Sequence, residues 1–225
     1  MLSNRIFISK NASEIDPVRS QFDELGFEVD SHSFLSFSSL ESDNHRVEIA
    51  RPYDVIFFGS PRAVIFFKAS QSISESAKIA CIGEKTAELL ESLGYTVAFR
   101  GEKSGEPKVV AEEFKVWLGS RSVLFPVSDR SLKTVSGLID ESQKEEVAVY
   151  STKVVGKLVG VSDVYVFTSP SNVDGFFLDN VIPEGAEVIA WGKSTEAALI
   201  SRAASVLYCL KNASFEELFA FLGQK

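Results

Sequence analysis

Two serine-proline pairs are the residues of this sequence best suited to hold an anion. Ser60-Pro61 follows the apolar stretch 55–58, and Ser169-Pro170 follows the apolar stretch 164–168. A helix that begins at such a serine leaves its first backbone N–H groups free beside the hydroxyl, and the helix dipole adds partial positive charge there. Carboxylates and phosphates bind at helix starts of this kind, so the pattern predicts two anion sites. Simple capping of each helix by its serine is the competing interpretation.

A glycine followed three residues later by a threonine gives a second pair of candidate anion sites. Gly83 and Thr86 follow one apolar stretch, and Gly192 and Thr195 follow another. Glycine lets a ligand approach the backbone closely, and threonine supplies a hydroxyl. Ordinary turn and capping chemistry is again the alternative.

The two signatures recur in the same order, which indicates an internal duplication. Each serine precedes its glycine by 23 residues, and the two copies lie 109 residues apart. In both copies the Ser-Pro pair is followed by a valine and then by two adjacent phenylalanines. We therefore expect two lobes of similar architecture, each presenting two helix starts at the carboxyl edge of its sheet, and a ligand that carries several negative charges.

Short apolar runs rich in Val, Ile and Phe alternate with amphipathic stretches of about ten residues, the pattern typical of α/β units around a parallel sheet. The expected strands are Ile6 to Ser9, Val55 to Phe58, Ile79 to Ile82, Val97 to Phe99, Val123 to Phe125, Val164 to Thr168, Val188 to Trp191 and Val206 to Tyr208.

Local signals place the ends of two helices between these strands. One helix is expected over 17–25, with Asp16 as its N-cap and Gly26 at its C-terminal stop. A second is expected over 86–93, with Gly94 as its stop.

Charge and run length exclude some classes of partner. The formal net charge is −8, so the chain lacks the broad basic surface that nucleic acids require. No apolar run approaches the ~18 residues that span a bilayer, and the N-terminus has no leader pattern, so we expect a cytoplasmic protein without a membrane partner.

The cysteines and histidines offer little chemistry. Cys81 and Cys209 lie far apart in apolar stretches and are expected to be core thiols, while His32 and His45 have no neighbours at ligand spacing, so no metal is expected. No Gly-rich dinucleotide loop is present, and Gly192-Lys193-Ser194 lacks the upstream glycine of a Walker loop.

In this order the duplicated elements resemble the uroporphyrinogen-III synthase family, and the resemblance spans nearly the whole chain. The residues that carry it are Phe57 to Val64, Ala80 to Ala87, Leu124-Phe125-Pro126, Val149 to Thr152 and Phe167 to Val173.

The resemblance implies two similar flavodoxin-like or Rossmann-like lobes with parallel sheets, joined by a two-stranded linker. Lobe 1 would combine residues 1–33 and 155–225, lobe 2 would span 38–147, and the linker strands would be 34–37 and 148–154.

The resemblance also implies a cofactor-free enzyme, which we expect to be a monomer, acting on hydroxymethylbilane, a linear tetrapyrrole with eight carboxylates. Tyr150 would help the substrate hydroxyl to leave, or else would pack the domain junction. Arg62 would pair with a carboxylate or lie on a helix surface, and Ser171 and Asn172 join the serines, glycines and threonines above as substrate-binding candidates.

Two residues depart from the family pattern and weaken the carry-over to the second copy. Trp191 stands where a small aliphatic residue is usual, and Lys193 where a neutral one is common.

Two other functions remain open. A non-catalytic two-lobed receptor for polycarboxylates would use the same helix starts, whereas a sugar-nucleotide enzyme with paired lobes would need a glycine-rich phosphate loop.

Overall fold

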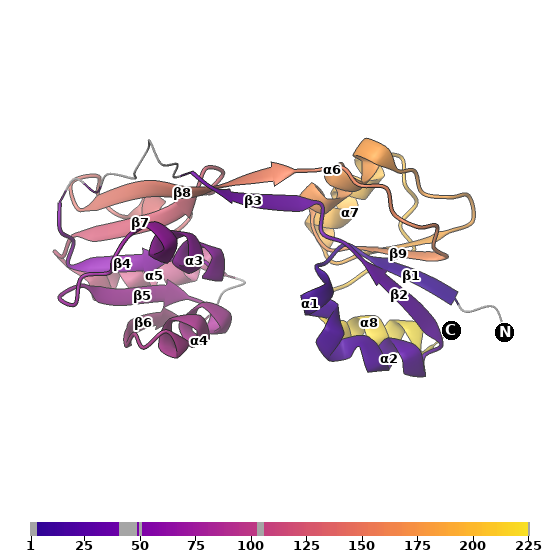
Figure 1. Ribbon diagram of the computed structural model, residues 1–225, viewed down its shortest axis with the longest axis horizontal. Coiled ribbons are helices and arrows are strands. Elements are labelled where there is room, and N and C mark those ends of the chain that lie inside the picture. The colour runs from indigo at the N-terminus through magenta and orange to yellow at the C-terminus, as the bar shows by residue number, and fades with distance from the viewer. Residues whose placement is uncertain (1–3, 41–48, 50, 103–105, 225) are drawn as a thin grey trace. The chain divides into compact units, whose positions relative to one another are not determined.

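The chain folds into two compact units, described here from a computed structural model of residues 4–40, 49, 51–102 and 106–224 (Figure 1). Unit 1 combines Met1–Ser36 with Lys153–Lys225, and unit 2 is the continuous stretch Phe37–Thr152. His45 lies outside the described residues. Within the described ranges, no helix has the length and apolar character that a membrane span requires.

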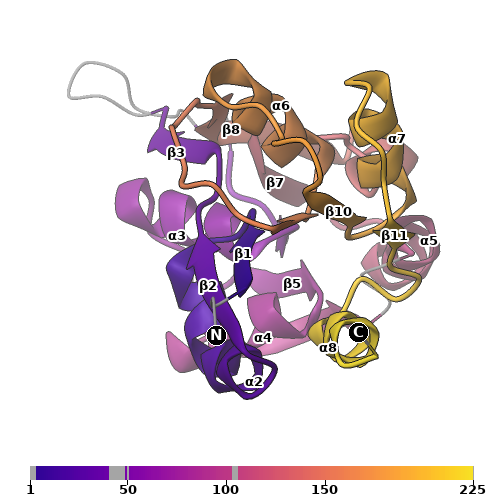
Figure 2. The same ribbon diagram turned by 90° about the vertical axis from the view of Figure 1, so that its right-hand side faces the viewer.

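Unit 1 is a parallel sheet in the order β11-β10-β9-β1-β2, covered by helices on both faces (Figure 2). Its strands are β1 (Asn4–Ile8), β2 (Phe27–Ser31), β9 (Val164–Phe167), β10 (Glu187–Ala190) and β11 (Tyr208–Cys209). Its helices are α1 (Ala12–Ile15), η1 (Asp16–Val18), α2 (Arg19–Glu24), α6 (Pro170–Asp179), α7 (Lys193–Ser201) and α8 (Phe215–Leu222).

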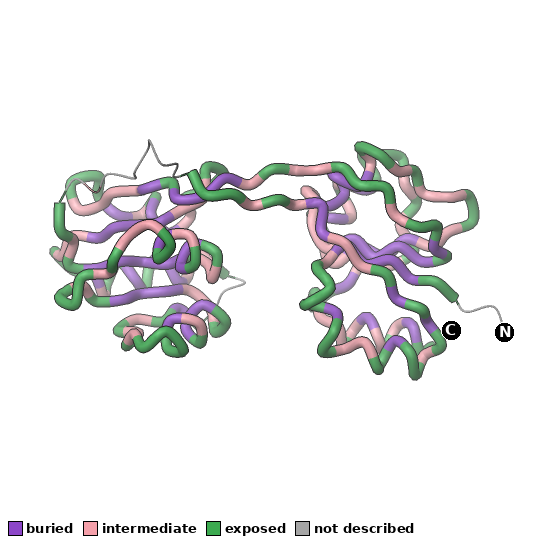
Figure 3. Tube along the Cα trace, viewed as in Figure 1, coloured by how far each residue is buried: buried purple, intermediate pink, exposed green. Residues whose placement is uncertain are grey.

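Alternation along the strands of unit 1 builds two cores, because successive side chains point to opposite faces. Ile6 and Ile8 of β1 pack with Phe22 and Leu218, on the side of α2 and α8. Phe7 packs with the aromatic and aliphatic side chains of α6 and α7 on the other side. The central strands β9 and β10 are therefore buried on both faces, as parallel strands usually are, whereas the edge strands β2 and β11 are partly exposed (Figure 3).

Unit 2 has a six-stranded sheet in the order β3-β8-β7-β4-β5-β6. Its elements are β3 (Leu35–Ser39), β4 (Val55–Phe58), α3 (Pro61–Ser70), β5 (Lys78–Ile82), α4 (Glu84–Ser92), β6 (Val97–Gly101), α5 (Pro107–Leu118), β7 (Val123–Ser128), η2 (Ser136–Leu138) and β8 (Lys144–Val154). Residues of α3 and α4 share one core with the sheet, and residues of α5 share a second core with its other face. The predicted α/β class with two parallel-rich sheets is confirmed.

The chain passes between the units within β3 and returns within β8. Inside unit 1, the Val155 N–H donates to the Phe34 carbonyl at 2.9 Å, and inside unit 2 the Leu40 N–H donates to the Val149 carbonyl at 3.2 Å. Residue numbers rise along one segment as they fall along the other, so the two segments run antiparallel.

The predicted helix start at Asp16 is wrong. Helical structure begins at Ala12, after Asn11, and the Glu14 carboxylate accepts from the Asn11 N–H at 3.3 Å. This half of a capping box starts the helix one turn earlier, so Asp16 lies within helical backbone, at φ −51°. Strand β2 follows directly and was not among the predicted strands.

The predicted helix stops at two glycines are confirmed. Gly26 and Gly94 have φ of 77° and 85°, the left-handed region in which glycine lacks the penalty that a Cβ brings.

The other local predictions need smaller corrections. Helix α4 begins at Glu84 rather than at Thr86, because Gly83 is its N-cap. Cys81 is fully buried, whereas Cys209 is half-buried on the edge strand β11.

Candidate functional site

A cavity of about 670 Å³ opens in unit 2 at the carboxyl ends of β4, β5 and β7. We call it the unit 2 pocket. Its apolar lining includes Phe57, Ile82, Phe125, Val127 and Val135, which continue the core on the α5 side of the sheet. A ligand with flat apolar rings would therefore find matching surface at the base of this pocket.

Three helices begin at the unit 2 pocket. Ser60 and Pro61 line it at the start of α3, Gly83 and Thr86 at the start of α4, and Pro107 at the start of α5. Converging helix starts add partial positive charge from three directions. The predicted residues Ser60, Gly83 and Thr86 are thus brought together around one cavity.

The free backbone donors are concentrated at α4. Gly83 has no side chain to cap the helix, and among the described residues no group accepts from the backbone N–H groups of Glu84, Lys85 and Thr86. By contrast, Ser60 Oγ accepts from the Ala63 N–H at 3.2 Å, so this serine does cap α3. Thr86, the third residue of α4, is 3% exposed and lines the cavity.

Two lysines and one glutamate give the lining a net positive charge. Lys85 and Lys133 are exposed, and Glu84 is paired with Arg100 at 3.1 Å. Lys133 Nζ lies 2.5 Å from a carboxylate oxygen of Glu146. Burial would raise the pKa of Glu146, but hydrogen bonds from Lys133 and Ser136 outweigh it and hold that pKa below its usual value.

Arg62 and Tyr150 are not among the residues named as lining the pocket, although Arg62 directly follows the lining residue Pro61, and both side chains lie beside the Phe37 ring. The Arg62 guanidinium lies 3.9 Å from the ring centroid of Phe37, and the Tyr150 ring is 6.3 Å from the same ring. Tyr150 is 8% exposed and stacks on Phe66 at 5.1 Å. The Tyr150 carbonyl accepts from the Asp129 N–H at 3.0 Å, which ties its strand to the segment after β7.

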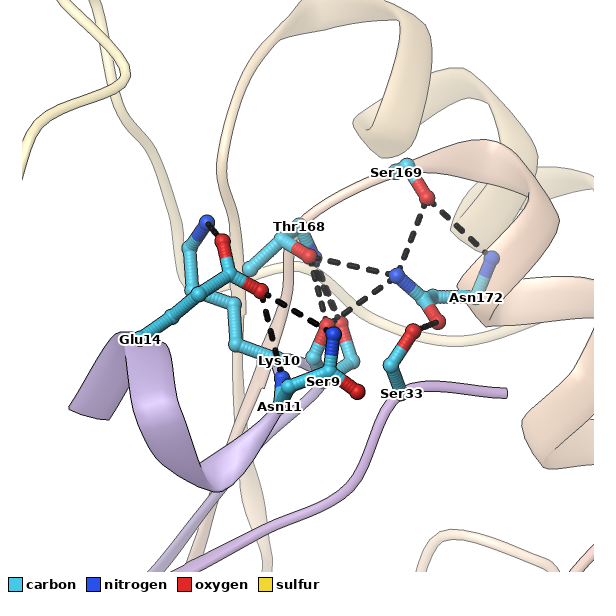
Figure 4. A network of polar contacts seen from close by, with 8 residues as sticks. All are labelled: Ser9, Lys10, Asn11, Glu14, Ser33, Thr168, Ser169 and Asn172. Carbon is cyan, nitrogen blue, oxygen red and sulfur yellow. Dashed lines mark hydrogen bonds and ion pairs between the residues drawn. The ribbon is translucent and has the colours of Figure 1, made fainter. Parts of the chain in front are cut away.

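In unit 1 the corresponding strand ends are closed by a hydrogen-bond network (Figure 4). Ser169 Oγ accepts from the Asn172 N–H at 3.2 Å and from Asn172 Nδ2 at 3.1 Å. Asn172 Nδ2 also donates to the Ser9 carbonyl at 3.0 Å, and Asn172 Oδ1 accepts from the Phe34 N–H at 2.8 Å. Asn172 is 5% exposed, and both its amide oxygen and its amide nitrogen are hydrogen-bonded within unit 1. Ser171 beside it is half-buried.

The second Gly-x-x-Thr start also differs from its counterpart. The Thr195 N–H donates to the Gly192 carbonyl at 3.0 Å, and Thr195 is 2% exposed. Lys193 Nζ pairs with Glu196 at 2.8 Å, and this hydrogen bond raises the pKa of Lys193. The Trp191 ring packs edge-on against Phe215 at 5.1 Å, so the two departures from the family pattern have partners of their own in unit 1.

Sequence reasoning missed the pocket residues from the end of β7 to the start of η2. Ser131, Lys133, Thr134 and Ser136 line the cavity but belong to neither repeated signature. A usable signal was present, because a polar run follows directly after the buried strand β7, and the carboxyl ends of parallel strands carry binding loops.

Neither a reactive thiol nor a cluster of metal-ligating side chains is found among the described residues of this site. Burial raises the pKa of Cys81 to about 11, which keeps this thiol protonated and unreactive at neutral pH. In the described part of the chain no cluster of three or more metal-ligating side chains occurs.

Fold and pocket together define a class: a two-unit α/β protein in which three helix starts and an apolar surface line one pocket at the carboxyl edge of a parallel sheet. The family model for uroporphyrinogen-III synthase HemD matches residues 16–220, and the chain therefore belongs to that family.

Solved structures agree on the fold. Uroporphyrinogen-III synthetase from Helicobacter pylori 26695 superimposes with a TM-score of 0.70 at 18% identity, covering 99% of this chain and 100% of that one. A mutant uroporphyrinogen III synthase from the extremely thermophilic bacterium Thermus thermophilus gives a TM-score of 0.55 at 13% identity, covering 98% and 99%. No match was found among curated proteins.

Proposed function

We propose that this protein cyclises hydroxymethylbilane to uroporphyrinogen III, with loss of water and inversion of ring D. The observation that carries the proposal is the convergence of three helix starts, two lysines and an apolar base on one pocket of a chain that belongs to the family. The substrate combines pyrrole rings with eight carboxylates, which match those two kinds of surface.

Binding would draw on the groups that line the unit 2 pocket. Substrate carboxylates would accept from the free N–H groups at the start of α4, from the Ser60 and Thr86 hydroxyls and from the lysines, while pyrroles cover Phe57 and Phe125. Each charge-assisted hydrogen bond contributes about 1.5–3 kcal/mol, so a few of them offset the entropy of ordering a flexible chain.

Unit 1 is proposed to supply further contacts to the same substrate. Ser169, Ser171, Gly192 and Thr195 lie at the starts of α6 and α7 and repeat the pattern of unit 2. The backbone of the two Ser-Pro starts is nearly identical, with φ and ψ of −165° and 159° at Ser60 and −161° and 157° at Ser169. Asn172 is proposed to contribute by holding Ser169 in place.

The chemical steps ask little of the protein beyond positioning and one proton. The C–O bond of the ring A hydroxymethyl group breaks, and the hydroxyl leaves as water after accepting a proton, for which Tyr150 is the proposed donor. Ring D then attacks the resulting ring A azafulvene through its substituted carbon to form a spiro intermediate. This intermediate reopens and closes again with ring D inverted, and the final closure releases the proton that restores the donor. Because unassisted cyclisation gives the symmetric type I isomer, the enzyme must hold the chain in the bend that favours type III.

The decisive experiment incubates the purified protein with freshly made hydroxymethylbilane and separates the oxidised products by isomer. We expect predominantly type III porphyrin, formed faster than in the blank. Type I product at the blank rate would reject the enzyme. If the protein also binds the substrate under those conditions, a non-catalytic polycarboxylate receptor becomes the better description.

A further inference from the structure

Lys133 lies between two cavities of unit 2. It lines the unit 2 pocket and also a smaller cavity of about 270 Å³, which Glu141, Lys144 and Glu146 line as well. Its ammonium group pairs with Glu146 at 2.5 Å, on the side of the smaller cavity. The Lys133 side chain is 63% exposed, so little packing holds it there.

The backbone of Lys133 is fixed although its side chain is not. Its φ is 55°, its carbonyl accepts from the Gly137 N–H at 2.7 Å, and its N–H donates to Ser131 Oγ at 3.3 Å. A lysine has four rotatable side-chain bonds, so the ammonium group can change partners while the backbone stays in place.

Glu146 remains supported if Lys133 moves away. Its side chain is 14% exposed, and Ser136 Oγ donates to its other oxygen at 2.5 Å. Lys144 also stabilises its charge and itself donates to the Ser136 carbonyl at 2.8 Å. The carboxylate therefore does not become an unpaired buried charge, which would be costly.

We propose that Lys133 is a carboxylate-binding residue of the unit 2 pocket that exchanges Glu146 for a carboxylate of the ligand. Glu146 acts as an internal competitor, because the same ammonium group cannot pair closely with both anions. The identity of the ligand as a linear tetrapyrrole rests on the proposed function, but the exchange itself requires only a polycarboxylate.

Exchange predicts opposite effects of two substitutions. Lys133→Met removes the cation and should weaken binding about tenfold, the loss of one charge-assisted contact. Glu146→Gln frees the cation and should tighten binding about threefold. In the double variant the glutamine should have almost no effect, because its benefit acts through Lys133. Lys115→Met on the exposed face of α5 is the matched control and should bind like the wild type.

The test titrates the full-length protein with benzenehexacarboxylate at fixed ionic strength by calorimetry, and measures KM for hydroxymethylbilane in parallel. A Glu146→Gln variant that binds more weakly than the wild type would overturn the exchange, and so would equal gains from glutamine with and without Lys133. If Lys133→Met does not fold, Lys133→Gln takes its place, with circular dichroism as the check.

The two proposals fail separately. Opposite shifts in benzenehexacarboxylate affinity, together with type I product at the blank rate, would support the exchange and reject the synthase. Type III product from the wild type, with KM unchanged in Lys133→Met and Glu146→Gln, would support the synthase and reject the exchange.

Discussion

The carboxyl edges of the two sheets differ although their strands correspond. Val55 pairs with Val123 in unit 2, and the equivalent Val164 pairs with Ile6 in unit 1, so β7 takes the place of β1. By this register Pro126 stands where unit 1 has Ser9. The repeat likewise sets Gly59 against Thr168 and Ala63 against Asn172.

The side chains at these three positions determine whether the strand ends are closed by hydrogen bonds or border a pocket. Ser9, Thr168 and Asn172 join one another, with Thr168 donating to the Ser9 carbonyl at 2.7 Å (Figure 4). Glycine, alanine and proline have no side-chain hydrogen-bonding groups, and in unit 2 that corner borders the pocket. One scaffold thus serves two purposes: changes in unit 1 should mainly cost stability, and changes in unit 2 should mainly cost binding and catalysis.

The largest effect is expected on stability in unit 1. Asn172→Leu should lower the free energy of unfolding by about 3 kcal/mol, because the buried Phe34 N–H and Ser9 carbonyl each lose a partner. Urea denaturation monitored by circular dichroism measures this, with Ser171→Ala as the neighbouring control. A loss below about 1 kcal/mol would mean that the network contributes little to the difference between the two edges.

The next effect is expected on catalysis in unit 2. Tyr150→Phe should lower kcat about fiftyfold, about 2.3 kcal/mol, and leave the melting temperature almost unchanged. Phenylalanine keeps the ring that stacks on Phe66, so this variant removes the hydroxyl alone. A rate within about twofold of the wild type would assign Tyr150 to packing instead of proton donation.

A matched pair of threonines compares the units directly. Thr86→Val should raise KM about fivefold, because Thr86 lines the unit 2 pocket, and Thr195→Val about twofold, because the start of α7 is proposed to supply only further contacts. Steady-state kinetics on both variants would test this order. Equal effects, or a larger one at Thr195, would remove the functional difference between the two helix starts.

The smallest effect concerns pH. The pKa of Glu146 is lowered in the folded protein, so its stabilising contribution is present above its unfolded pKa and is lost as the pH falls through the folded value. Glu146→Gln should therefore reduce the free energy of unfolding by about 1 kcal/mol at pH 7 and by less near pH 3. Denaturation at both pH values checks the sign, and a deficit that grows toward acid pH would contradict it.

Local chemistry made much of the fold predictable. Apolar runs identified most strands, and Gly26 and Gly94 fix helix ends through their own φ angles. The role of Asn172 was beyond reach, because its partners lie 138 and 163 residues away in the sequence. The polar run after β7 could have marked Lys133 as a pocket residue, but its pairing with Glu146 depends on how that segment folds back toward β8.

The discontinuity of unit 1 sets an order for folding during synthesis. Strand β1 pairs with β2 on one side and with β9 on the other, and β9 is made after all of unit 2. Unit 2, being continuous, has every partner it needs once residue 152 has left the ribosome. Strand β1 must therefore keep one edge unpaired during synthesis until β9 emerges and completes the sheet of unit 1.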